Sequence, residues 1–369
     1  MTDVMKAQSD AEFLGMVPRL AGYTATNSII CAPFAGKRTE AAFRLDLPER
    51  KRTTDYRAIA SWVVGTLSRM RGVDGVTLVI YTDETFEANH GVPWLDFSRY
   101  LADSVHKQGF HMPGFLCVAA DGWANYFDRD YPREGRPLTE IPVGAPIASI
   151  AERTELPQVS EAERYSFLEM IVDLCSGYWP SNLRHIDTTD DRAFIELCAT
   201  WREGELPEAM LALLAELCQS NAYRDEIALQ FAFGMLVADA LAEQNDTYLE
   251  IQRRDGGTMD DVVLREIEAG RASLDDEFAG LLMGVGRMRP NVERVEHGIR
   301  LFKRIVALAP RHYAPNALCI VAWLLWARGL ASGAGHFIDQ ALEIDPEHGM
   351  ALLLRTIVAN GRLPEWTFG

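Results

Sequence analysis

The pattern of apolar residues changes near residue 145, and this change constrains the fold of the 369-residue chain more than any other feature. Before it, short apolar runs typical of strands alternate with segments of helical periodicity. After about Ser149 the periodicity is helical and we find no convincing strand, in segments such as PEAMLALLAELCQS and VERVEHGIRLFKRIVALA. The sequence therefore predicts an N-terminal three-layer α/β domain with a mixed sheet, followed by an all-α domain of helical hairpins.

Five segments of the front part have the composition of strands. NSIICAPF and TEAAFRLDLP flank the turn AGKR, and Pro48 ends the second of them. GVTLVIYTD and FLCVAAD are short apolar runs, as expected for strands that are buried on both faces. GWANYF follows across Asp121-Gly122, a turn dipeptide that predicts an antiparallel partner for FLCVAAD.

Helices are expected between these strands. The first begins with Ser9 or Asp10 as its N-cap. The second, TTDYRAIASWVVGTLSRMRG, has its apolar residues on one side, and we expect Thr53 or Thr54 to cap it and Gly72 to close it. A third, before KQGF, also has one apolar face.

The same pattern divides the chain into four regions. We expect a flexible tail over 1–10, the α/β domain over 11–145, a helical middle region over 146–260 and a tetratricopeptide-like helical region over 261–369. The segment DRDYPREGRPLTEIPVGAP is rich in proline, glycine and charge, which predicts a long loop or linker. The longest apolar run, ALCIVAWLLWA, is well short of the ~20 residues that span a bilayer, so we interpret it as a buried helix.

Two stretches of the helical part share a spacing. WREGELPEA and WARGLASGA both have the form W-x-x-G-x-x-x-x-A, which is typical of a helix, a glycine turn and a second helix. The later copy, within LCIVAWLLWARGLASGAGHFIDQALEIDPEHGMA, resembles a tetratricopeptide unit. In this resemblance Ala322 lies in the first helix, Gly329 in the turn, Ala334 and Ala341 on the packing face of the second helix, and Pro346 at the exit. A plain helical hairpin without a peptide groove is the alternative.

Charge and cysteine content restrict the partners. The formal net charge is −17; residues 1–145 carry 16 basic and 18 acidic residues, and the remainder carries 20 and 35. This acidity of the helical part repels phosphate backbones, so we expect no nucleic-acid binding. Six scattered cysteines without a CxxC pair, and an N-terminus without an apolar segment, predict a cytoplasmic protein that does not bind membranes.

Several longer motifs occur along the chain in one order. They are SDAEFLGMVPRLAGYTATNSIIC, FRLDLP, GVTLVIYTD, EGRPL, SNAYRDEIAL and AWLLWARGLASGAGHFIDQALEIDP. On these motifs the chain resembles the actinobacterial domain-of-unknown-function family 4192 over nearly its full length. The resemblance implies an architecture and a bacterial cytoplasmic setting, and it implies no activity. Members often carry cysteines just before GRPL; this chain has none there, so no metal or redox role of such cysteines is carried over.

Three carboxylates are the candidate site residues. Asp83 and Glu84 follow the buried strand GVTLVIYTD, and Asp121 closes the next buried strand. Ligands of open α/β sheets bind beyond the carboxyl ends of strands, and carboxylates there can hold Mg²⁺ or act as a general base. If the two strands are neighbours, all three groups share one edge of the sheet. The alternative is an exposed strand end with an aspartate N-cap for the next helix, and Asp-Gly as an ordinary turn.

Other charged residues receive structural interpretations. We expect Arg136 in GRPL to hold the linker by hydrogen bonds, and Arg224 and Asp225 to form a helix cap and a buried ion pair. CAPFAGKRT departs from a phosphate-binding loop at Cys31 and Arg38, and the chain has no HExxH and no GxSxG motif.

Two functional hypotheses remain. The first is an interaction or scaffold protein whose acidic helical part binds a protein partner, with no cofactor; the helical repeat and the missing catalytic signatures favour it. The second is an enzyme or ligand-binding protein with its site at Asp83, Glu84 and Asp121, for which Mg²⁺ is the candidate ion. The sequence leaves open the substrate, the partner, the oligomeric state and whether the α/β domain has any catalytic activity.

Overall fold

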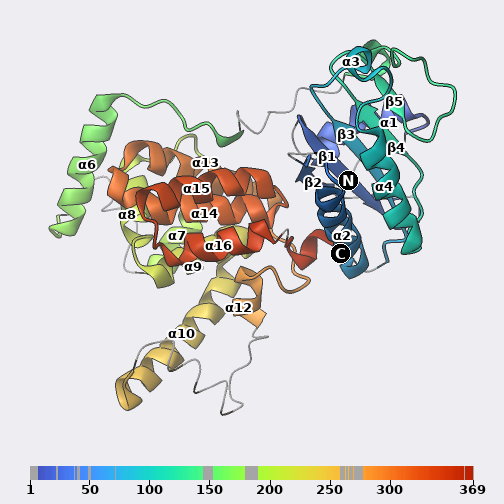
Figure 1. Cartoon of the computed structure of the whole chain (residues 1–369). Helices are drawn as coiled ribbons and strands as arrows, with labels where there is room; N and C mark the ends of the chain where they lie inside the picture. The colour runs from blue at the N-terminus through green and yellow to red at the C-terminus, as the bar shows by residue number, and fades with distance from the viewer. Residues whose placement is uncertain are drawn as a thin grey trace. The chain divides into compact units, whose positions relative to one another are not determined.

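The computed structural model describes most of the chain (Figure 1). The described residues are 7–21, 24–36, 38–39, 42–48, 51–70, 72–143, 153–178, 190–257, 262, 265, 269, 277–360 and 362–368. The chain divides into two compact units, with the boundary between Arg153 and Thr154. The first, the α/β unit, contains the sheet; the second, the helical unit, has no strand among its described residues. The predicted fold class is confirmed.

A five-stranded mixed sheet forms the centre of the α/β unit, in the order β2-β1-β3-β4-β5. β3 and β4 are parallel, and the other neighbouring pairs are antiparallel. The strands are β1 (Ser28–Phe34), β2 (Phe43–Asp46), β3 (Gly75–Tyr81), β4 (Phe115–Val118) and β5 (Trp123–Asn125). β1 and β3 are buried along nearly their whole length, because runs of apolar residues without alternation must be covered on both faces.

The α/β unit also contains helices. They are α1 (Asp10–Ala21), α2 (Thr53–Arg69), α3 (Phe86–Asn89), α4 (Leu95–Lys107) and the 3₁₀ helix η1 (Leu138–Glu140). α2 packs against α4, and α1 contacts β1. The rings of Tyr56 in α2 and Phe97 in α4 have centroids 4.9 Å apart. α4 lies within the crossover connection that the parallel pair β3 and β4 requires.

The predicted N-cap of α1 is confirmed. The hydroxyl of Ser9 accepts a hydrogen bond of 3.2 Å from the backbone N–H of Glu12, as expected for the start of α1. The prediction of Thr53 or Thr54 as the cap of α2 is wrong. Arg52 is the last residue with extended backbone angles, so both threonines lie inside the first turn, and no side chain caps this helix. Gly72 follows the end of α2 with a φ of 76°, in the left-handed region.

The helical unit consists of α6 (Glu161–Cys175), α7 (Asp191–Thr200), α8 (Glu208–Leu217), α9 (Asn221–Phe233), α10 (Met235–Asp255), α12 (Glu277–Leu282), α13 (Val292–Leu308), α14 (Ala314–Ala327), α15 (Ala331–Ile344) and α16 (Gly349–Ala359), with the 3₁₀ helices η3 (Arg311–Tyr313) and η4 (Glu365–Phe368). α14 lies inside this group and packs against α9, α13, α15 and α16 (Figure 1). Every residue of α14 is buried, which confirms the buried helix expected from ALCIVAWLLWA.

The expected hairpin is formed by α14 and α15. Gly329 lies in its turn with a φ of 77°, a conformation in which a side chain would be strained. Ala322, Ala334 and Ala341 are fully buried. Small residues at these positions let the two helix backbones approach closely, which is the packing that the sequence predicted for a helical hairpin.

Candidate functional site

The three candidate carboxylates lie at the same edge of the sheet, beyond the carboxyl ends of β3 and β4. β3 pairs in parallel with β4, with Tyr81 opposite Val118, so the condition for a shared edge is met. Asp83 and Glu84 follow β3, and Asp121 lies in the turn between β4 and β5. The parallel pairing of β3 and β4 therefore places all three groups where a strand-end site is expected. Their side chains, however, each have a structural partner.

Asp83 is paired with Asn27, which lies directly before β1. The side-chain amide of Asn27 donates to Oδ2 of Asp83, and the backbone N–H of Asp83 donates to Oδ1 of Asn27 at 2.9 Å. β1 and β3 are antiparallel, so the start of one lies beside the end of the other. Asn27 has a φ of 41°, which asparagine tolerates better than most residues. The pair therefore joins the ends of the two central strands.

Glu84 forms an ion pair with Lys51. The Lys51 Nζ atom lies 2.7 Å from Oε1 and 2.8 Å from Oε2 of Glu84. The same ammonium group lies 4.6 Å from the ring centroid of Trp94, a cation–π contact. The indole N–H of Trp94 donates to the Thr82 hydroxyl at 3.2 Å. Glu84 thus helps to fix the segment before α2 to the end of β3.

Asp121 holds the start of α3. Its Oδ1 accepts from the backbone N–H of Phe86 at 2.8 Å, and its Oδ2 accepts from that of Glu87 at 3.2 Å. Thr85 is the N-cap residue, and its hydroxyl accepts from the N–H of Ala88. The alternative interpretation, in which an aspartate is the N-cap of the helix after the strand, is therefore wrong, because the N-cap is Thr85. The free N–H groups of the first turn are satisfied by a threonine cap and by an aspartate from the neighbouring strand end.

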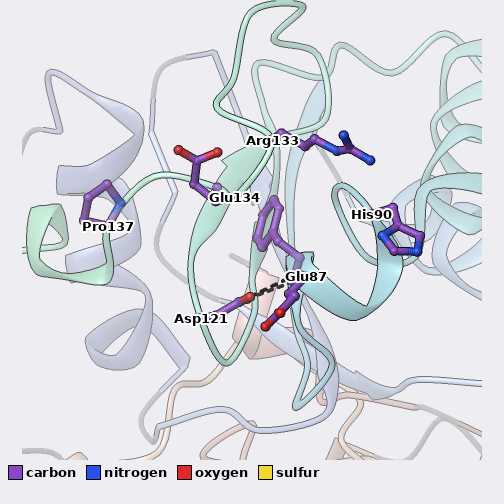
Figure 2. Close-up of a pocket in the computed structure, with 8 residues that line it drawn as sticks. Glu87, His90, Asp121, Arg133, Glu134 and Pro137 are labelled. Atoms are coloured by element: carbon purple, nitrogen blue, oxygen red, sulfur yellow. Dashed lines mark hydrogen bonds between the residues drawn. The ribbon is translucent and has the colours of Figure 1, made fainter.

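A pocket with a volume of about 600 Å³ lies beside this edge (Figure 2). Its lining residues are Phe86, Glu87, His90, Asp121, Arg133, Glu134, Gly135 and Pro137. In Figure 2 the Arg133 side chain extends toward the side of His90, and Glu134 toward the side of Pro137. The volume falls within the range of small-molecule sites, ~300–1,000 Å³. In the part of the chain that the structure describes, no group of three or more His, Cys, Asp or Glu could hold a metal ion.

The segment with EGRPL forms one wall of this pocket. Gly135 has a φ of 78°, and a Cβ atom there would lie 2.9 Å from the ring of Phe86, so only glycine lets the segment approach so closely. The guanidinium of Arg136 donates to Asp128 and lies 5.0 Å from the ring centroid of Trp123. Its backbone also exchanges hydrogen bonds with Trp123. The expectation that Arg136 holds this segment in place is confirmed.

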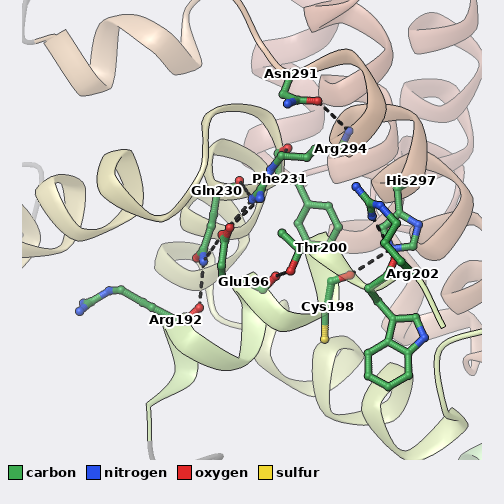
Figure 3. A network of polar contacts seen from close by, with 11 residues as sticks. Arg192, Glu196, Cys198, Thr200, Arg202, Gln230, Phe231, Asn291, Arg294 and His297 are labelled. Atoms are coloured by element: carbon green, nitrogen blue, oxygen red, sulfur yellow. Dashed lines mark hydrogen bonds and ion pairs between the residues drawn. The ribbon is translucent and has the colours of Figure 1, made fainter.

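The helical unit contains a polar network around Arg294 (Figure 3). The guanidinium of Arg294 in α13 donates to both carboxylate oxygens of Glu196 in α7, at 2.6 and 2.9 Å. It also donates to the backbone carbonyls of Gln230 and Phe231 in α9. Burial raises the pKa of Glu196, but the hydrogen bonds from Arg294 and Gln230, with the charge of Arg294, together hold that pKa below its usual range. The network joins three helices that are distant in sequence.

The expected ion pair at the start of α9 is present. Arg224 is buried, and its Nε donates to Asp225 at 2.8 Å. Its Nη1 donates to Asn221 and Asn316. The prediction that Arg224 and Asp225 form the cap is wrong, because Ser220 is the N-cap residue and its side chain makes no capping bond. Arg224 joins α9 to α14 by its hydrogen bond to Asn316.

The outer face of α6 is a feature that the sequence analysis missed. Phe167 and Ile171 are buried, and α6 contacts α8 and α13. Tyr165, Leu168 and Val172 are 64%, 39% and 55% exposed. Apolar residues occur on both sides of this helix, so periodicity alone does not show which side is covered. The available signal in the sequence was the occurrence of apolar residues on two sides of one helix.

Comparisons with known proteins give one finding. A family model described as "Domain of unknown function (DUF4192)" matches residues 11–173 and 188–365. No curated protein and no solved structure gives a significant match. Among the described residues, none of the helices has both the length and the hydropathy to cross a membrane.

Proposed function

The chain belongs to the family described as "Domain of unknown function (DUF4192)", and we propose that it is a protein-interaction or scaffold protein whose acidic helical unit binds a protein partner. The observation that carries this proposal is the exposed apolar face of α6. Three large apolar side chains are exposed on one helix of a compact unit. Contiguous exposed apolar surface on a folded protein is typical of interaction sites.

The contacts of the three candidate carboxylates support the same proposal. Asp83, Glu84 and Asp121 are each engaged with an amide, an ammonium group or backbone N–H groups that hold the fold together. A general base or a metal ligand needs a carboxylate oxygen directed at a reacting group or ion. These contacts favour a structural role for all three groups.

The packing of consecutive helices supports a proposal about the type of helical repeat. α13 and α14, and then α15 and α16, follow one another with short connections, and consecutive helices are in contact. We propose that these hairpins are tetratricopeptide-like. We also propose a cytoplasmic location, which is supported by the six free cysteines.

The test uses the full chain with a photo-crosslinking amino acid at single exposed positions. Tyr165 in α6, Leu236 in α10 and Leu353 in α16 probe the helical unit, and Phe127 is the matched exposed position in the α/β unit. We expect helical-unit positions to crosslink in living cells to a defined protein that the Phe127 position does not reach. That protein is then purified, and its binding to the chain is measured by calorimetry. Identical products from both units, or no products, would refute the proposal.

A second candidate function is the binding of a small polar ligand in the strand-end pocket. It is supported by the volume of the pocket and by the cationic and acidic groups, Arg133 and Glu134, at its wall. Thermal unfolding is measured with Mg²⁺ and with nucleotides, on the wild type and on the Arg133→Ala and Glu134→Ala variants. A saturable rise in the melting temperature that either variant removes would support this candidate. An unchanged melting temperature with every ligand would exclude these ligand classes from the site.

A further inference from the structure

α6 has two apolar faces, and only one of them is covered. Phe167 and Ile171 are buried on the inner face. Tyr165, Leu168 and Val172 follow at spacings of three and four residues, which places them on one stripe of the helix. All three are exposed. In Figure 1, α6 lies at the margin of the helical unit. We call these three residues the α6 stripe.

Acidic side chains accompany the α6 stripe. Glu169 and Asp173 follow Tyr165 at four and eight residues, so they run along one side of the stripe. Glu161 lies one turn before Tyr165 at the start of the helix. All three acids are exposed, and none of them forms an ion pair with another described residue. The stripe is thus an apolar surface with an edge of carboxylates that are available to a partner.

Because this surface is both apolar and acidic, it favours some classes of partner and repels others. A second copy of the chain would bring two sets of these carboxylates together, in a protein whose net charge is already −17. An anionic membrane or a nucleic acid would be repelled for the same reason. A helix with one apolar face and lysine or arginine along its edge would bury the stripe and pair with the acids.

Building on the proposed function, we infer that the α6 stripe and its acidic edge are the docking surface for a basic amphipathic helix of a protein partner. The apolar side chains of the partner contact Tyr165, Leu168 and Val172. Its basic side chains pair with Glu169 and Asp173. Charge complementarity of this kind selects the partner and speeds association, and the apolar contact supplies most of the affinity.

The test measures binding of a fluorescein-labelled model peptide to the full chain by anisotropy. The peptide is about 16 residues long, with leucine at helical spacing on one face and lysine along both edges. One control peptide has glutamate in place of every lysine, and another has the same composition in scrambled order. Circular dichroism and thermal unfolding confirm that each protein variant is folded.

Wild-type protein should bind the lysine peptide saturably and bind neither control peptide. The Leu168→Ser Val172→Ser double variant should weaken binding about tenfold or more. The Glu169→Gln Asp173→Asn double variant should weaken binding and reduce its dependence on salt. Val143→Ser, which removes an exposed apolar side chain from the α/β unit, is the matched control and should leave binding unchanged.

Three results of the peptide assay would overturn the inference. They are no saturable binding of the lysine peptide at about 1 mM, equal binding of the glutamate peptide, and equal binding by wild type and by the Leu168→Ser Val172→Ser variant. Dimerisation that this same variant abolishes in sedimentation would assign the stripe to a second copy instead.

Failure of the proposed function can be distinguished from failure of this inference. If crosslinks from α10 and α16 persist in the stripe variant, the helical unit binds a partner elsewhere and only the docking surface is wrong. If no position crosslinks to any protein while the peptide still binds, the proposed function is wrong.

Discussion

Replacing Glu196 by alanine should destabilise the helical unit strongly, because Arg294 would lose its only described carboxylate partner. The side chain of Arg294 is 11% exposed and that of Glu196 is 27% exposed. The pair is bidentate, and Gln230 donates a further hydrogen bond to Glu196 at 3.1 Å. Removing the carboxylate leaves a buried guanidinium with backbone carbonyls of α9 as its remaining acceptors.

The magnitude follows from the burial of the pair. Breaking a fully buried ion pair by removal of one partner costs about 3–5 kcal/mol. Glu196 is more than a quarter exposed, so water enters the vacated space and solvates part of the charge on Arg294. We therefore expect Glu196→Ala to lower the free energy of unfolding by about 2–3 kcal/mol. In a unit of about 200 residues this corresponds to a melting temperature lower by about 4–12 °C. Glu196→Gln keeps one acceptor and should cost about 1–2 kcal/mol.

The assay is guanidinium unfolding followed by circular dichroism at a helix wavelength, with hydrogen exchange of α7 and α13 to localise the effect. Glu343→Gln is the matched control, since this glutamate is exposed on α15, and its substitution should change stability by less than about 0.5 kcal/mol. An effect of Glu196→Ala as small as that of the control would refute the argument that the network joins α7, α9 and α13.

The effect of Glu196 should also depend on pH. Its pKa is lowered in the folded protein, so its contribution to stability is complete above the ordinary glutamate pKa, ~4.3, and is lost as the pH falls through the lowered value. The difference in stability between wild type and Glu196→Gln should therefore be constant near neutral pH and shrink on acidification below about pH 4. A difference that grows on acidification would contradict the direction of the pKa shift.

Three further predictions test other parts of the fold. Asp121→Ala removes the acceptor for two N–H groups of α3 and should lower the free energy of unfolding by about 1 kcal/mol, with faster hydrogen exchange at Phe86; unchanged exchange would contradict the capping role. Gly298→Ala places a Cβ atom 2.7 Å from the ring of Phe231 and should cost about 1–3 kcal/mol in chemical unfolding, and a neutral result would show that the two helices can separate. Gly329→Ala strains the turn of the α14–α15 hairpin at a φ of 77° and should cost about 1 kcal/mol, whereas asparagine at this position should cost less; equal melting temperatures for the two variants would contradict the strain.

Much of the fold could be predicted because its signals are local. Apolar runs and helical periodicity depend on neighbouring residues alone, so the strands, the buried helix α14 and the change to an all-helical part followed from them. Caps were predicted less well. A cap depends on the residue at which the backbone angles change, and at α2 this residue is Arg52, so Thr53 and Thr54 lie inside the first turn.

The candidate site could be predicted in position and not in its interactions. Asp83 and Asp121 share one edge because β3 and β4 are neighbours in the sheet. The sequence does not show which strands are neighbours. Their partners come from elsewhere in the fold: Asn27 from the start of β1, and the N–H groups of α3 for Asp121. Such pairings bring together residues that are more than 30 positions apart, and no local pattern encodes them.

The sequence by itself determined which segments are strands, which are helices and where acidic charge accumulates, because these properties are set by residue type and spacing along the chain. Only the tertiary structure decided which side chains remain exposed. α6 carries apolar residues on two sides, and the stripe of Tyr165, Leu168 and Val172 is exposed because α8 and α13 cover only the opposite side. Exposure is a property of the packed neighbours, so it appears only once the helices are assembled.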